Sequence, residues 1–204
     1  MKSFFNPDNE LWRGVSYAFD IFVLCICFVL TSSLVFTLGL GICALYYAVD
    51  KYLVPRKAMP IEGFAKSIKQ NYKIAILAEI ILAAVVLFVA WSMWISYQMM
   101  SGGVLMGRVV FTFGIVILIF VVGYISFVFP TLASYKYSLR ELLGISFKLT
   151  VVHLPVALLF SVLYLLVILF AYYFWPSLFF TPVLVVLVQR KFLDGIYSRY
   201  TKGI

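Results

Sequence analysis

Charged residues are scarce in this chain. Of its 204 residues, only 12% are Asp, Glu, Lys or Arg and 65% are hydrophobic, and the mean hydropathy is +1.09. Soluble globular domains carry about 25% charged and roughly 45–50% apolar residues. A water-soluble chain of this composition would expose large apolar patches and aggregate. The composition therefore excludes a soluble domain and predicts an integral membrane protein with the lipid bilayer as its solvent.

Residues that carry chemistry are equally few. The chain has one histidine, His153, and three cysteines, Cys25, Cys27 and Cys43. The cysteines share one apolar run without His or carboxylate at metal-ligand spacing, which predicts small hydrophobic side chains rather than a metal or redox site. The sequence also lacks Walker, nucleophile-elbow, zinc-protease and dinucleotide-binding motifs. We therefore expect no catalytic residues, no cofactor, no metal site and no enzymatic activity.

Long runs free of Asp, Glu, Lys and Arg are the dominant feature. They lie between Asp20 and Asp50, Glu79 and Arg108, Arg108 and Lys136, and Lys148 and Arg190. Each exceeds the roughly 20 apolar residues that a helix needs to cross a bilayer. Pro176 divides the last run, which is too long for one crossing. The sequence predicts one all-α domain over 1–204, a polytopic bundle with five spans at about 17–40, 74–97, 109–129, 150–174 and 177–192.

The distribution of positive charge predicts the orientation. With five spans, one side holds six Lys and Arg in 51–73, three in 134–150 and four after residue 189, which is 13 of the 16, and the other side holds three. With four spans the split is nine against seven. Because Lys and Arg collect on the cytoplasmic side, we expect the N-terminus outside and the C-terminus in the cytoplasm. The net charge is +8, but the sequence contains no nucleic-acid recognition motif, so we expect no nucleic-acid partner.

Two basic loops show helical periodicity. In 61–73 apolar residues recur at spacings of three and four with lysines on the opposite face, and 139–148 is similar. This predicts two amphipathic helices on the cytoplasmic surface. Two interpretations stay open, an anchor on anionic lipid or a docking site for a partner. The candidate docking residues are Lys66, Lys69, Lys73, Arg140, Glu141 and Gly144.

Three ionisable residues at membrane depth are functional candidates. Asp20 lies near the outer end of the first span, Glu79 about one and a half turns into the second, and His153 just inside the fourth. At similar depths, Glu79 and His153 would be able to pair or carry a proton in a transport role. An interfacial location or a structural hydrogen bond is the alternative interpretation.

Short motifs along nearly the whole chain resemble the YesL-type family of bacterial membrane proteins. They are Phe5-Asn6-Pro7-Asp8-Asn9, Thr37-Leu38-Gly39, Ala44-Leu45-Tyr46-Tyr47, Lys69-Gln70-Asn71-Tyr72-Lys73, Phe129-Pro130, Ser138-Leu139-Arg140 and His153-Leu154-Pro155. The family has no defined biochemical function, and its genes often accompany those for polysaccharide degradation and sugar uptake. The resemblance implies a bacterial plasma-membrane protein that is accessory to carbohydrate uptake or regulates it, with a sugar transporter or its ATPase as partner.

A second resemblance is to ABC importer permeases, whose cytoplasmic loop docks the ATPase through a Glu, a Gly and an apolar-x-Leu-Pro stretch. Glu141, Gly144 and Val152-His153-Leu154-Pro155 are similar, although Leu142-Leu143 replaces the Ala-Ala of that loop. It implies the alternative that the chain is itself a transport subunit that docks an ATPase through 134–155. The sequence identifies neither a substrate nor an oligomeric state.

Overall fold

The computed structural model describes residues 10–33, 35–56 and 59–201, and these residues fold into α-helices without any strand. The prediction of an all-α protein is therefore confirmed for the described chain. Three short helical turns, η1 (Val35–Thr37), η2 (Val49–Leu53) and η3 (Trp175–Phe179), connect some of the elements. The α-helices are α1 (Glu10–Ser32), α2 (Leu38–Ala48), α3 (Pro60–Ser101), α4 (Leu105–Ser134), α5 (Leu139–Val152), α6 (Leu154–Tyr173) and α7 (Thr181–Thr201).

Four helices among the described residues are long and apolar enough to cross a membrane. They are Gly14–Ser32 of α1, Pro60–Ser101, Leu105–Ser134 and Leu154–Tyr173. The predicted fifth span over 177–192 begins in η3 and continues into α7. Because α7 carries Arg190, Lys191 and Asp194 within its 21 residues, it is less apolar than the other four.

The predicted first span over 17–40 is not one helix. α1 ends at Ser32, and the chain then turns through η1 into α2. The Thr31 hydroxyl donates to the Cys27 carbonyl at 2.7 Å, and such side-chain bonds compete with the regular helix and bend it. A Cβ on Gly41 would meet the Ser32 hydroxyl. The first turn of α2 therefore doubles back beside the end of α1.

α2 is the centre of the core. Eight of its 11 residues are buried, among them Leu45 and Tyr46. Helices α1, α3, α4 and α7 all contact it. Gly39 permits the closest of these approaches, because a Cβ there would overlap the Phe129 ring of α4. Small residues allow this kind of close helix packing in membrane proteins.

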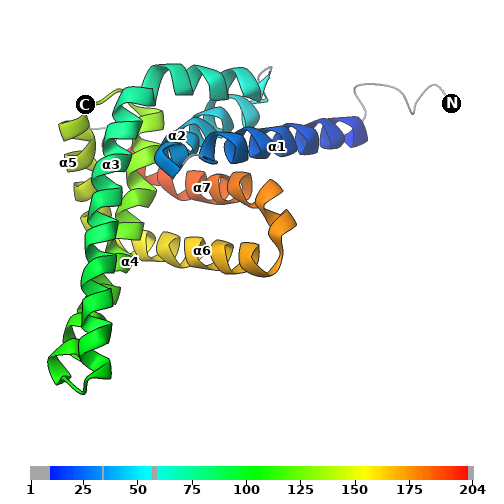
Figure 1. Ribbon diagram of the computed structural model, residues 1–204. Coiled ribbons are helices and arrows are strands. Elements are labelled where there is room, and N and C mark those ends of the chain that lie inside the picture. Colours follow the sequence, from blue (N-terminus) through cyan, green and yellow to red (C-terminus); the bar gives the residue numbers. More distant parts are fainter. Residues whose placement is uncertain (1–9, 34, 57–58, 202–204) are drawn as a thin grey trace, which may run out of the picture.

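The predicted surface helix over 61–73 is the beginning of α3, a helix of 42 residues. In Figure 1 its first turns lie across the top of the molecule, and the helix then bends into the long segment that runs down the left side. Its buried face also differs from the predicted one. Phe64 is buried as expected, but Ser67 is fully buried while Ile61 and Tyr72 are 47% and 45% exposed. The other loop helix is a separate element, α5.

Two hairpins diverge from a common end of the molecule. In Figure 1, α3 and α4 run down the left side, whereas α6, η3 and α7 run to the right and back, with α1 next to α7. The hairpins are joined where the Ser161 hydroxyl donates to the Ile119 carbonyl (2.9 Å) and the hydroxyls of Thr131 and Tyr197 lie 2.9 Å apart. The described helices therefore open into a V rather than forming an aligned five-helix bundle.

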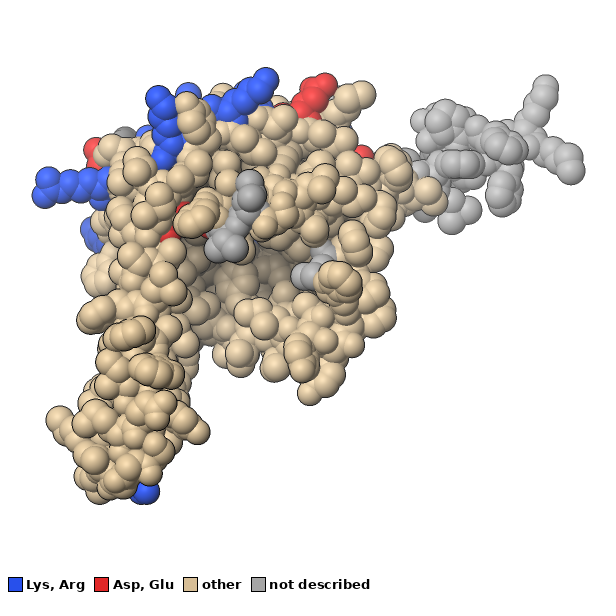
Figure 2. All heavy atoms as spheres, viewed as in Figure 1, with Lys and Arg blue, Asp and Glu red and all other residues tan. Residues whose placement is uncertain are grey.

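The two ends of this V differ in chemistry. Figure 2 shows Lys and Arg gathered over the first turns of α3 and over α5, where the hairpins meet, and we name this region the charged end. Arg108 lies at the opposite tip, in the first turn of α4. Exposed aromatic residues, which are typical of membrane–water interfaces, occur near the tips of both hairpins. They are Trp91, Trp94 and Tyr97 on α3, and Tyr172, Tyr173 and Trp175 at the end of α6 and the start of η3.

Candidate functional site

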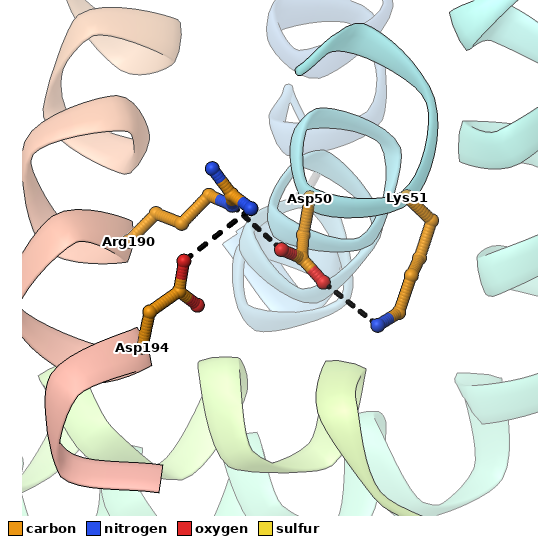
Figure 3. Close-up of polar contacts among 4 residues, drawn as sticks. All are labelled: Asp50, Lys51, Arg190 and Asp194. Carbon is orange, nitrogen blue, oxygen red and sulfur yellow. Dashed lines mark hydrogen bonds and ion pairs between the residues drawn. The ribbon is translucent and has the colours of Figure 1, made fainter. Parts of the chain in front are cut away.

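Four charged residues form a cluster where η2 meets α7 (Figure 3). Arg190 Nε lies 2.6 Å from Asp50 Oδ1, and Arg190 Nη2 lies 3.3 Å from Asp194 Oδ2. The second oxygen of Asp50 accepts Lys51 Nζ at 3.0 Å. Asp50 ends the first charge-free run and Arg190 ends the last one, 140 residues later. The pair therefore places the ends of these two runs side by side.

The cluster favours an ionised Asp50. Burial opposes the charged form, but the hydrogen bonds and charges of Arg190 and Lys51 outweigh it and lower the pKa of Asp50. For Asp194, burial and the nearby Asp50 charge raise the pKa, and Arg190 only partly offsets them. Arg190 thus pairs with two carboxylates, and its loss would remove the ion pair that each of Asp50 and Asp194 makes with it. The pairing of Asp50 with Arg190 was not predicted from the sequence, although each partner stands at the end of an apolar run.

Polar side chains attach α7 to its neighbours at several further points. Gln189, which is fully buried, donates from Nε2 to the Tyr164 hydroxyl at 2.7 Å. Tyr197 meets Thr131 of α4, and the buried Tyr46 hydroxyl of α2 makes no hydrogen bond with the described residues. A net hydrogen bond contributes about 0.5–1.5 kcal/mol. Together with the Arg190–Asp50 ion pair, the two hydrogen bonds act as a structural clamp that holds α7 against η2, α4 and α6.

Glu79 of α3 faces the beginning of α2. The backbone of Leu38, Gly39 and Leu40 lies beside its carboxyl group, so the carboxylate occupies the positive end of the α2 dipole. Its Oε2 atom is buried without a hydrogen-bond partner among the described residues. This geometry corresponds to the structural alternative for Glu79, in which the residue caps a helix that starts inside the apolar region.

His153 and Asp20 lie in other settings. His153 joins α5 to α6, since its N–H donates to the Leu149 carbonyl (2.9 Å) and its own carbonyl accepts from Val156 N (2.9 Å). The groups acting on Glu79 belong to the α2 backbone, so a Glu79–His153 proton pair gains no support from this geometry. Asp20 is half-buried in α1 and makes no ion pair with the described residues.

The predicted docking residues divide into two groups. Lys66, Lys69 and Lys73 are exposed on one face of α3 and make no ion pair within the described chain. Glu141 instead has a local structural role, because its carboxylate accepts the Ser138 N–H (3.0 Å) and hydroxyl (2.8 Å) in a capping box at the start of α5. The remaining two, Arg140 and Gly144, are exposed on α5.

The cysteines and acidic residues do not assemble into a metal site. Cys25 and Cys43 are buried free thiols, and Cys27 is a partly buried one. Cys43 Sγ lies 3.9 Å from the Ser67 hydroxyl at the α2–α3 contact. The part of the chain that the structure describes holds no group of three or more His, Cys, Asp or Glu that could bind a metal ion. These thiols pack as small core side chains.

The charged end thus combines a clamp that fixes α7, a row of free lysines on α3 and an exposed helix, α5. The resemblance to the YesL-type family stays a prediction from the sequence. Comparison of the chain with family models, with curated proteins and with solved structures finds no match.

Proposed function

We propose that this chain is a non-enzymatic, multi-pass membrane protein that binds an acidic surface of a partner protein through the lysine face of α3. Lys66, Lys69 and Lys73 define this face. The proposal rests on one observation, namely that all three lysines are exposed and make no ion pair within the described chain. The resemblance supplies the setting, in which the partner is a sugar transporter or its ATPase and the chain is accessory to carbohydrate uptake.

The lysine face is rigid and its charge is uncompensated. Phe64 and Ser67 are buried beside it, so the lysines project from a fixed helix over about 10 Å, the rise of seven residues. Among the acidic residues nearby, Asp50 and Asp194 pair with Arg190 and Glu141 caps α5. Glu62, exposed one turn before Lys66, makes no ion pair with the described lysines. An unneutralised row of positive charge steers and orients an acidic partner.

We further propose that the charged end lies in the cytoplasm. The Asp50–Arg190 contact supports a return of α7 to the side that holds the 51–73 loop. The aromatic tips of both hairpins support an outer interface at the opposite end. The packing of Phe22, in the middle of α1, against Phe179 and Phe180 at the tip of the α6–α7 hairpin supports a start of α1 at the outer end, with the N-terminus outside as the charge count predicted. The cytoplasmic side then holds the 13 loop and tail residues of the 16 Lys and Arg, with Lys2, Arg13 and Arg108 opposite.

Photo-crosslinking in cells tests the docking proposal. A photoreactive residue at Tyr72, which is exposed beside Lys73, is combined with either K66E/K69E/K73E or K66R/K69R/K73R. We expect an adduct on an Asp- and Glu-rich segment of the partner, at least ten-fold weaker in the Glu variant and retained in the Arg variant. Equal adducts in both variants would contradict the proposal.

Sugar uptake tests the accessory role separately. We expect cells that lack the chain to accumulate less labelled sugar, and the wild-type chain but not K66E/K69E/K73E to restore it. Uptake unchanged by deletion would rule out a role in carbohydrate import while leaving partner docking intact.

The permease-like alternative is favoured by the exposure of Gly144 on α5, in the loop that leads to α6. In that case the ATPase docks on 134–155. Gly144→Asp would then abolish recovery of the ATPase, and reversal of the α3 lysines would not.

A further inference from the structure

α5 presents an outward face on which basic and apolar residues alternate. The opposite face is packed against the protein, since Leu142, Ser146 and Thr150 are fully buried. The exposed residues follow spacings of four, three and one, which form a single stripe on a helix. They are Arg140, Glu141, Gly144, Phe147, Lys148, Val151 and Val152. The one acidic residue among them, Glu141, already accepts the Ser138 N–H and hydroxyl.

Local contacts hold this stripe in place. The Ser138–Glu141 capping box fixes the first turn, and the Tyr124 hydroxyl of α4 donates to the Leu143 carbonyl at 2.9 Å. Arg140 and Lys148 lie eight residues apart, which separates them by about 12 Å along the helix axis. Neither forms an ion pair within the described chain, so both charges are available to an external anion.

The apolar part of the stripe continues the membrane-facing surface of the protein. Phe147, Val151 and Val152 are 52%, 47% and 55% exposed, and the surface extends to Leu154 and Leu158 of α6, at 41% and 43%. A soluble acidic partner that contacted only the basic groups would leave this apolar surface in water. A helix at the boundary between acyl chains and headgroups satisfies both kinds of residue.

We infer that the outward face of α5 binds anionic phospholipid, with Arg140 and Lys148 on the headgroup phosphates and Phe147 and Val151 among the upper acyl chains. This inference is independent of the lysine face of α3. Each basic residue near an anionic leaflet contributes about 1 kcal/mol, or roughly five-fold in association. The preference for phosphatidylglycerol over phosphatidylcholine should therefore depend on both side chains.

Quenching by brominated lipids in nanodiscs measures this preference. A bimane label is placed at Val151→Cys in a chain whose three cysteines are replaced, and brominated phosphatidylglycerol is titrated against brominated phosphatidylcholine. We expect a preference for phosphatidylglycerol of about ten-fold or more, which R140Q/K148Q lowers to less than two-fold. The matched control K66Q/K69Q removes two charges from α3 and should keep the preference.

Three outcomes would overturn the inference. They are an unquenched label, a preference that R140Q/K148Q leaves unchanged, and an equal loss in K66Q/K69Q, which would show a non-specific charge effect. A further result would assign α5 to protein docking instead. In that case R140Q/K148Q would keep the lipid preference but lose the adduct that forms when the photoreactive residue is placed at Tyr72. If R140Q/K148Q fails to fold, the melting temperature of the wild-type chain is measured instead, with either phosphatidylglycerol or phosphatidylcholine added. We expect the larger stabilisation with phosphatidylglycerol. Equal stabilisation by the two lipids would then contradict the inference.

Discussion

The pairing of Asp50 with Arg190 makes an asymmetric prediction. Asp50→Asn leaves Arg190 with a second carboxylate, Asp194, 3.3 Å away. Arg190→Gln instead leaves the largely buried carboxylate of Asp50 close to the exposed carboxylate of Asp194, with only Lys51 beside Asp50. Since like charges and unpaired buried charges both destabilise a fold, Arg190→Gln should be the more damaging change.

The magnitude lies between two limits. Exposed ion pairs contribute about 0–1 kcal/mol, and removal of one partner of a fully buried pair costs about 3–5 kcal/mol. The side chains of Asp50 and Arg190 are 13% and 25% exposed. We therefore expect losses in the free energy of unfolding of about 2 kcal/mol for Asp50→Asn and about 3 kcal/mol for Arg190→Gln.

Unfolding in detergent by titration with sodium dodecyl sulfate measures these losses. Lys51→Gln is the matched control, because the Lys51 side chain is 54% exposed and its loss should cost less than about 1 kcal/mol. The double variant D50N/R190Q should be clearly less destabilised than the sum of the single variants. Additivity within about 0.5 kcal/mol would refute direct coupling between the two side chains, and equal effects of Lys51→Gln and Arg190→Gln would refute the asymmetry.

Three further predictions concern the core and the charged end. Gly39→Val should destabilise the protein by about 1–3 kcal/mol because its side chain would overlap the Phe129 ring. Gly144→Ala is the control, because an added Cβ there meets no atom within 4 Å, and it should be neutral or slightly stabilising in the same sodium dodecyl sulfate titration. Glu79→Leu should cost about 0.5–2 kcal/mol through loss of the α2 cap, and Glu79→Gln less because its amide oxygen still accepts; equal losses would contradict capping. Because the folded-state pKa of Asp50 is lowered, its stabilisation is present above its ordinary value of 3.8 and is lost as pH falls through the folded pKa. The melting temperature of the wild-type chain should thus approach that of Asp50→Asn only at pH values below 3.8, and a difference that is already lost above that pH would contradict the pairing.

The helical membrane character was predictable from the runs of 20 or more uncharged residues. Such runs are long enough to cross a bilayer, and a helix satisfies their backbone hydrogen bonds there. The break after Ser32 was not predicted. Its local signals are modest, and the carboxyl that caps α2 comes from Glu79, about 40 residues further along the chain. A tertiary contact of this kind has no signature in a hydropathy pattern.

The charged end shows the same limit. Lys66, Lys69 and Lys73 were identified as a basic helical face, but the sequence placed them in a loop separate from the following span. Lys is a good helix former, and 61–79 holds no Pro and only Gly63, at its start. The helix therefore continues from the surface segment into the long segment, although it bends between them (Figure 1). The Asp50–Arg190 pair depends on how α7 returns to η2 across 140 residues, which charge counting alone does not determine.

Site-directed labelling tests the central claim, a cytoplasmic charged end, most directly. Single cysteines replace Ser3, Lys69 or Arg108 in a chain without its native cysteines, and a membrane-impermeant maleimide is applied to intact and to permeabilised cells. We predict that Ser3→Cys and Arg108→Cys react in intact cells, whereas Lys69→Cys reacts only after permeabilisation. Reaction of Lys69→Cys in intact cells would contradict the orientation of the whole molecule, and a Ser3→Cys that reacts only after permeabilisation would contradict the outer N-terminus.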